Sequence, residues 1–230
     1  MLSHLRLRLR PRSGLSIIEL MVGVAVGLLV VAGALSLYVN NLVSSRALVG
    51  QARLAQDLRA AADLVVRDLR RAAYWGNAIS GTSAVGAGST TPRNPYAAAT
   101  GSTADGLSYG FTRDNTENDA LDDGERFGFR VRSGVLQMQT SVDTWQDVTD
   151  RRAVLIDDNG LSITATLTTL PLGHLCPRTC VAGTPNCPTT TVRRFDITLS
   201  GRSLSDDTAQ RRITASVRLR NDALAGQCPA

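Results

Sequence analysis

The chain contains no lysine, so all 25 of its basic residues are arginines. Aromatic residues are also scarce, at 4% of the sequence, and a folded domain must therefore build a mainly aliphatic core. Only two histidines are present, His4 and His174, and no His-Glu-x-x-His or phosphate-loop sequence occurs. We therefore expect no enzymatic activity and no cofactor, with an aspartate-based hydrolase as the enzymatic alternative.

The positive charge is concentrated near the start of the chain. The formal net charge is +5, but Arg6, Arg8, Arg10 and Arg12 supply four of the 25 basic residues with no acid among them. Without that segment, 21 basic residues face 20 acidic ones, which leaves a net charge of +1. The use of arginine without lysine is better explained by a GC-rich genome than by selection for bidentate recognition of phosphate groups. Because no basic stripe with interleaved aromatics is visible, no specific nucleic-acid binding is expected.

Charge is absent between Leu20 and Val39, a stretch that suits one helical crossing of a membrane at ~1.5 Å per residue and ~30 Å of hydrocarbon. The preceding arginines should stay in the cytoplasm by the positive-inside rule, so the chain after Asn40 should lie outside it. One carboxylate, Glu19, stands at the head of the stretch, where an unpaired charge is costly. The sequence predicts a membrane anchor whose acid has a partner, or alternatively a plain signal anchor with Glu19 at the interface.

The junction before this stretch resembles the class III signal of type IV pilins and type II secretion pseudopilins. From Gly14 to Leu20 it reads Gly-Leu-Ser-Ile-Ile-Glu-Leu, between a basic segment and an apolar one. The resemblance implies a leader of residues 1–14, cleavage by a prepilin peptidase between Gly14 and Leu15, and N-methylation of Leu15. It also implies that Glu19 pairs with the N-terminal amine of a neighbouring subunit. Leu15 departs from the phenylalanine that is usual there, although cleavage depends mainly on the glycine.

Proline is absent from Leu15 to Trp75, so a continuous helix of ~60 residues and ~90 Å is allowed. In the later part, apolar residues recur at steps of three or four, as in an amphipathic helix. These residues are Leu48, Ala52, Ala55, Leu58, Ala62, Val65, Leu69 and Ala72. We expect residues 15–39 to meet lipid or other subunits, residues 40–76 to dock on a domain, and the helix to stop at Gly76.

The end of the predicted helix narrows the resemblance. Residues 67–76 read Arg-Asp-Leu-Arg-Arg-Ala-Ala-Tyr-Trp-Gly and are similar to the minor pilin PilW family, while residues 213–221 resemble the closing strand of minor pilins. The resemblance implies an α+β fold, the type IV pilin-like lollipop, in which a long N-terminal helix packs on an antiparallel β-sheet domain. From the residues alone, Tyr74 and Trp75 are two aromatics expected to pack on that domain.

The remainder divides into an irregular segment and a β domain. Residues 77–106 are rich in Gly, Ala, Ser, Thr and Pro and are expected to form a surface loop. Strand-like alternation follows within residues 107–230 and favours an antiparallel sheet with one buried face. The predicted strands are 107–112, 126–132, 135–140, 145–148, 154–157, 161–170, 192–200 and 213–220.

An acidic stretch between Asp114 and Glu125 is a weak candidate for a cation loop. The EF-hand spacing fails, because counting from Asp119 puts Arg130 at the twelfth position. A solvated hairpin loop is therefore expected, and no metal is assigned. The candidate ligands, if a cation bound, would be Asp119, Asp122, Asp123 and Glu125.

Four cysteines fall late in the chain, at Cys176, Cys180, Cys187 and Cys228. In an exported domain they predict two disulfides with three possible connectivities, which would staple the C-terminal region. A zinc set formed by three of them with His174 is the alternative, and an oxidising compartment disfavours it.

The function implied by the resemblance is that of a PilW-like minor pilin, which helps to prime and assemble the type IV pilus used in adhesion and motility. It would be a single-pass inner-membrane protein with a periplasmic domain, and would reach the cell surface in the pilus. The implied partners are other minor pilins, the major pilin, the prepilin peptidase, the inner-membrane assembly platform and, before assembly, membrane lipid. The alternatives are a type II secretion minor pseudopilin, a pilus-tip subunit for adhesion or DNA uptake, and a signal-anchored periplasmic enzyme.

Overall fold

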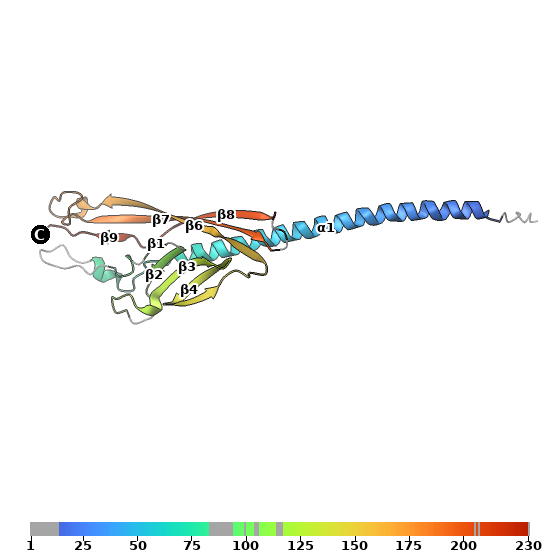
Figure 1. Cartoon of the computed structure of the whole chain (residues 1–230). Coiled ribbons are helices and arrows are strands. Elements are labelled where there is room, and N and C mark those ends of the chain that lie inside the picture. Colours follow the sequence, from blue (N-terminus) through green and yellow to red (C-terminus); the bar gives the residue numbers. More distant parts are fainter. Residues whose placement is uncertain are drawn as a thin grey trace, which may run out of the picture. The chain divides into compact units, whose positions relative to one another are not determined.

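The computed structural model describes residues 14–82, 94–98, 100–103, 106–113, 117–204, 206 and 208–229. The chain divides into two compact units, Met1–Leu48 and Val49–Ala230, and each is described by itself. Figure 1 shows helix α1, which contributes to both units, and the strands of the second unit. The candidate sites lie at the start of α1 and in the β domain.

Helix α1 spans Ile17–Leu69. It ends before the predicted stop at Gly76, so that prediction was wrong. The chain instead leaves the helix through a tight turn. In this turn the N–H groups of Arg71 and Ala72 donate to the carbonyls three residues back, each with an N···O distance of 3.0 Å. Ala73 then has a φ of +60°, in the left-handed region that ends helices. Glycine usually fills this position, so the sequence carried no stop signal here.

The first sheet contains five strands in the order β1-β2-β3-β4-β5, all antiparallel. The turn between β3 and β4 is Ser133-Gly134, and both residues have positive φ, as a two-residue hairpin of the right twist requires. The strands are β1 (Gly101–Thr103), β2 (Gly106–Gly110), β3 (Arg126–Arg132), β4 (Val135–Ser141) and β5 (Thr144–Asp147).

The second sheet has the order β6-β7-β8, with β9 also paired to β7. The two strands predicted at 154–157 and 161–170 are one strand, β6, because its pairing with β7 continues across an irregularity between Ile156 and Leu161. Strands β1 and β9 were missed because each is only three residues long. The strands are β6 (Val154–Pro171), β7 (Thr189–Ser203), β8 (Gln210–Arg218) and β9 (Ala223–Ala225).

The antiparallel strands of the domain form two sheets and not one. Residues 148–153 turn the chain out of the first sheet. Among the described residues, β6 then packs beside that sheet with one backbone–backbone hydrogen bond to it, from the Ile156 N–H to the Gly134 carbonyl over 2.9 Å. Three short 3-10 helices complete the description, η1 (Ala78–Thr82), η2 (Asp123–Glu125) and η3 (Gly173–Leu175). Strand β1 lies within the stretch predicted to be an irregular loop.

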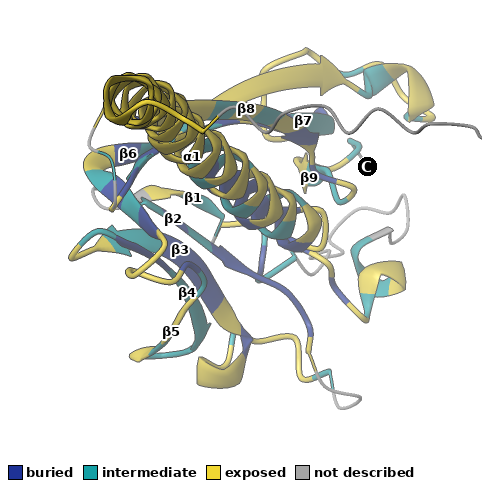
Figure 2. Ribbon diagram, turned by 90° about the vertical axis from the view of Figure 1, so that its right-hand side faces the viewer, coloured by how far each residue is buried: buried dark blue, intermediate teal, exposed yellow. Residues whose placement is uncertain are grey.

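One core joins the later part of α1 to the inner faces of both sheets (Figure 2). Leu54, Leu58 and Val65 point into it from the helix, and the apolar side chains of the sheets meet them. Aromatic rings stack in this core, for example those of Phe111, just after β2, and Phe127 of β3, with ring centroids 4.3 Å apart. The structure confirms the predicted α+β fold of the pilin-like type, with a long N-terminal helix, antiparallel sheets and disulfides near the C-terminus.

Candidate functional site

The predicted processing and assembly residues lie at the start of α1. Gly14, Leu15 and Ser16 precede the helix, and Glu19 lies in its first turn. The Leu20 N–H donates to the Ser16 carbonyl over 3.1 Å, and a carboxylate here interacts favourably with the helix dipole. The side chain of Leu15 is 74% exposed, so the bond between Gly14 and Leu15 lies at an accessible helix start.

The apolar side chains of the first unit are exposed on all sides of the helix. Helix α1 is long and apolar enough to cross a membrane, judged by length and composition, and is compatible with a single membrane anchor. None of the apolar window is buried by the rest of the described chain. Exposed apolar surface on this scale indicates a lipid or protein environment. Large exposed side chains include Leu20, Met21, Val24, Leu28, Leu29, Leu35 and Leu37.

The Arg-Asp-Leu-Arg run at the end of α1 forms a buried polar link to β2. Asp68 is only 6% exposed; it accepts a hydrogen bond from the Tyr109 hydroxyl and pairs with the Arg71 guanidinium. Burial, and then the charge of Asp68, raise the pKa of Tyr109 well above its usual value. The Arg71 guanidinium also lies 4.8 Å from the centre of the Phe111 ring. These contacts fix the helix end against the first sheet.

The two aromatics after the helix have different environments. Trp75 is buried with Ala73 and Tyr96, as expected, whereas Tyr74 is half exposed and does not pack as predicted. The chain here runs beside the end of β2, because the Ala73 N–H donates to the Gly110 carbonyl over 2.7 Å. A second bond runs from the Thr112 N–H to the Tyr74 carbonyl over 2.9 Å. Of the two aromatics, only Trp75 therefore anchors this segment by burial.

Two glutamates share the hydroxyl of buried Tyr96. The hydroxyl lies 3.1 Å from Oε1 of Glu117 and 3.0 Å from Oε1 of Glu125. Burial and the two carboxylates raise the pKa of Tyr96, with the Thr112 hydroxyl acting in the opposite direction. A phenol that stays protonated can donate its single hydrogen to one carboxylate at a time. The cluster joins Tyr96 to the acidic stretch that begins after Phe111 and includes Glu117 and Glu125.

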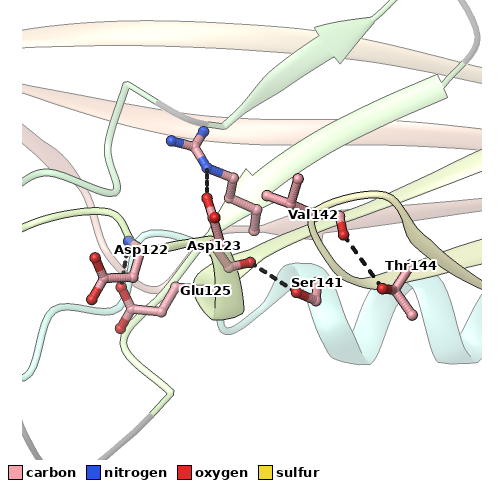
Figure 3. A network of polar contacts seen from close by, with 7 residues as sticks. Asp122, Asp123, Glu125, Ser141, Val142 and Thr144 are labelled. Carbon is pink, nitrogen blue, oxygen red and sulfur yellow. Dashed lines mark hydrogen bonds and ion pairs between the residues drawn. The ribbon is translucent and has the colours of Figure 1, made fainter.

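The candidate cation ligands each have a protein partner. Glu125 is buried and accepts the Asp122 N–H over 3.1 Å, while the Asp122 side chain accepts from Asn118 over 2.8 Å. Asp123 faces Arg126 at 3.9 Å, and its carbonyl accepts the Ser141 hydroxyl over 3.2 Å (Figure 3). Within the described ranges, no three His, Cys, Asp or Glu residues are placed to hold a metal ion. Asp114, at the start of the stretch, lies outside the described residues.

The four cysteines form two disulfides, Cys176–Cys228 and Cys180–Cys187. This is one of the three connectivities that the sequence allowed. The zinc alternative was wrong, because the sulfurs it requires are oxidised and His174 stands exposed beside them. The first disulfide joins the loop after β6 to the segment after β9, and the second closes a small loop before β7.

Sequence reasoning missed the two polar clusters of the β domain. Asp68 and Tyr109 are far apart in the sequence, and only the folded structure brings them together in a buried hydrogen bond that links α1 to β2. Tyr96 carried one usable signal, since it is a lone aromatic within a stretch of small residues. Glu117 and Glu125 were recognised as part of the acidic stretch, but their hydrogen bonds to the Tyr96 hydroxyl were not predicted.

Comparison with known proteins gives one family. A family model described as prepilin peptidase-dependent protein B matches residues 47–219, which is more than half of the chain. No curated protein matches, and no solved structure matches. The match runs from the middle of α1 past the end of β8 and so covers the shared core of helix and sheets. The chain therefore belongs to the prepilin peptidase-dependent protein B family, a family of type IV pilin-like structural proteins.

Proposed function

We propose that the chain is a PilW-type minor pilin, cut between Gly14 and Leu15 by a prepilin peptidase and N-methylated on Leu15. It acts by helix packing and not by catalysis, first in the inner membrane with its domain in the periplasm and then in the type IV pilus. The observation that carries the proposal is the first part of α1, which exposes apolar side chains all round and has its single carboxylate, Glu19, in the first turn.

The position of Glu19 suits a contact between subunits. Cleavage after Gly14 would create an ammonium group on Leu15, four residues before the carboxylate. An ammonium of one subunit and Glu19 of another are complementary charges in a medium of low dielectric, where leaving either unpaired is costly. Such a pair would set the axial register between neighbouring helices, which apolar packing alone specifies weakly.

The helix surface is suited to exchange lipid for protein contacts. A Cβ added at Gly23, Gly27 or Gly33 would meet nothing within 4 Å in the single chain, so these positions offer room for close approach of another helix. Membrane lipid covers the surface before assembly, and helices of the major pilin and other minor pilins cover it afterwards. The assembly platform of the inner membrane is the expected site of that exchange.

Mass spectrometry of the N-terminus tests processing. The protein is recovered from membranes and from sheared pili, and a methylated Leu15 is expected in both. A retained Met1, or a cut downstream of Val39, would contradict the proposal. The methylated protein could instead be recovered from membranes, while deletion of its gene blocks protein secretion and leaves pili intact. That result would assign the chain to a type II secretion pseudopilus.

The role of Glu19 is tested separately with Glu19→Ala. We expect the variant to be processed normally but lost from sheared pili, because only the intersubunit pair is removed. Ser36→Ala, in the same apolar part of the helix, is the matched control and should enter pili like the wild type. Normal pilus entry of Glu19→Ala would contradict the proposed pairing.

A further inference from the structure

Strand β6 has an unpaired edge. It pairs with β7 along one side through Pro171, and no other described residue pairs with its backbone from Thr164 to Pro171 on the opposite side. The second part of the strand is exposed, and the Leu167 side chain is 62% exposed. An edge of this kind is a template for adding a strand.

Hydrogen bonds show which residues of β6 face the free edge. The Arg193 carbonyl of β7 accepts from the Leu219 N–H over 3.0 Å, so alternate residues of β7, beginning with Arg194, direct their backbone groups toward β6. Arg194 pairs with Thr166, which therefore faces β7. The residues between those facing β7 direct their N–H and C=O groups outward; they are Ala165, Leu167 and Thr169.

Two further bonds agree with this assignment. The Leu172 N–H donates to the Pro188 carbonyl over 2.8 Å, so Leu172, like Thr166, faces β7. From the outer side, the Ser102 hydroxyl donates to the Ile163 carbonyl over 3.3 Å. Pro171 faces outward in the same series but has no N–H, so the run of outward donors ends at Thr169.

Among the described residues, the edge from Thr164 to Thr169 lacks the usual devices that prevent pairing. From Leu161 to Pro171 the sequence has no charged residue, and the only irregularity in its pairing with β7 lies before Leu161. Native edge strands are usually protected by charge, by bulges or by a covering segment. Only Pro171, at the far end, acts in that way. A flat, uncharged edge is complementary to a strand that is also uncharged.

The edge extends past the end of α1. Strand β8 begins beside the helix, where the Arg211 guanidinium lies 3.2 Å from the Gln51 side chain, and after β8 ends the Asn221 amide donates to the Ala72 carbonyl over 3.1 Å. The strand therefore runs in the direction of α1. Strand β6 does too, since both pair antiparallel with β7. Asn221 lies between Leu219, which is level with Leu167, and Ala223, which is level with Thr169. The strand after Thr169 therefore extends past the contact with Ala72.

We propose that this edge docks an extended, uncharged β-strand of a different pilin-like subunit. A second copy fits poorly: antiparallel pairing of two β6 edges would reverse one α1 relative to the other, although both must enter one membrane. In a parallel pair, a residue whose backbone groups face the partner strand lies level with one that faces away, so two identical edges must be offset by one residue. A two-fold axis places identical residues level with each other and cannot supply that offset. A non-identical subunit meets neither obstacle. The choice of partner rests on the proposed function; the free edge does not.

Backbone amide exchange at single-residue resolution tests the proposal on the full chain. In the isolated, detergent-solubilised protein, the amides of Ala165, Leu167 and Thr169 should exchange rapidly, while those of Thr166 and Thr168 are slow because they bond to β7. In assemblies with other pilin-like subunits, the rapid class should disappear and the slow amides should not change. The alternation within one strand is the internal control.

A pair of variants separates the backbone from the side chain. Leu167→Pro removes an outward N–H but no bond to β7, and should lower recovery in assemblies by about fivefold to tenfold, the loss expected for one hydrogen bond. Leu167→Ala keeps the N–H and should assemble nearly as well as the wild type. Thermal unfolding of both variants checks that the domain remains folded.

Several results would overturn the docking site. The three amides could be slow in the isolated chain at every concentration, which would show a cover within the chain, or slow only at high concentration, which would show a second copy. They could also stay rapid in the assembly. A methylated Leu15 in that same sample would leave the proposed function standing, whereas absence of the chain from every assembly overturns both proposals.

Discussion

The indole Nε1 of Trp75 donates to Oδ1 of Asp119 over 2.8 Å. The same carboxylate accepts from the Asn77 amide over 3.1 and 3.2 Å, so it ties the chain that leaves α1 to the segment before β3. Asp119 has a φ of +59°, a conformation that aspartate tolerates better than most residues. The acid expected as a possible cation ligand is thus a hydrogen-bond acceptor for the helix exit.

Replacing Trp75 tests this tie. Trp75→Phe keeps an aromatic ring but removes the donor and leaves unfilled space, so we expect a loss of about 1–3 kcal/mol in the free energy of unfolding. Trp145→Phe is the control for loss of an indole at a partly buried position. The Arg130 guanidinium carbon lies 3.8 Å from the centre of the Trp145 ring, and the Trp145 indole N–H bonds to no described residue. Urea unfolding of both variants measures the difference, and equal losses would contradict the role of the Asp119 bond.

Stability should depend on pH through Glu117. Burial alone would raise its pKa, but four hydrogen bonds more than offset that and hold the pKa below its usual value of 4.5. The donors are the Thr112 and Tyr96 hydroxyls and the N–H groups of Asp119 and Gly76. Because the folded state favours the carboxylate, this stabilisation is present above pH 4.5 and is lost as the pH falls toward the lowered pKa.

Glu117→Gln should remove that part of the pH dependence. Between about pH 5 and about pH 3, the unfolding free energy of the wild type should fall more steeply than that of the variant. Asp63→Asn, at an exposed position of α1, controls for the loss of one charge and should follow the wild type. Parallel curves for the wild type and Glu117→Gln would refute the assignment.

The two disulfides should differ in their effect on stability. The cysteines of Cys176–Cys228 are 52 residues apart in the sequence and those of Cys180–Cys187 are 7 apart. In the chain-entropy description, closing the longer loop contributes about 4 kcal/mol and the shorter one about 2.5 kcal/mol. Serine replacement of each pair, followed by chemical denaturation, compares them, and a larger loss from the short loop would contradict this account.

Leucines on one helix should differ sharply in their contribution. Leu58→Ala empties a site at 0% exposure in the shared core and should cost about 2–5 kcal/mol in unfolding free energy. Leu48→Ala removes the same atoms from an exposed position and should leave the unfolding of the β domain nearly unchanged. A small loss at Leu58 would show that the helix is not a structural part of the domain core.

The sequence was sufficient for features with a strong local period. The steps of Leu58 and Val65 predicted the buried side of α1, whereas Leu48 and Ala52, predicted on the same side, are exposed, because burial begins only at Leu54. Alternation in 126–132 predicted β3 with its bounds. Local patterns were not sufficient where the deciding contact is distant. The helix end depends on Ala73 bonding to Gly110, a contact that no propensity at Ala73 signals. Likewise, cysteine pairing depends on where β9 returns beside β7.

The candidate sites divide in the same way. The residues at Gly14, Leu15 and Glu19 form a contiguous motif, so sequence alone could propose them, and their processing and pairing remain predictions. The free edge of β6 could not be proposed, because its strand was expected to be two pieces and its pairing side follows only from the bonds of Arg193 and Leu172. An exposed edge is a property of the whole sheet.

The alignment of β6 and β8 with the later part of α1 has a mechanical consequence. Bonds of an antiparallel ladder lie across its strands, so a load applied along the helix and resisted at β6 would shear many bonds at once, instead of opening them one by one. Strands β7, β8 and β9 all lie between Cys176 and Cys228, and that cross-link limits how far this part of the chain could extend. If β6 is held in an assembly as proposed, this part of the domain would transmit tension along the helix with little lengthening.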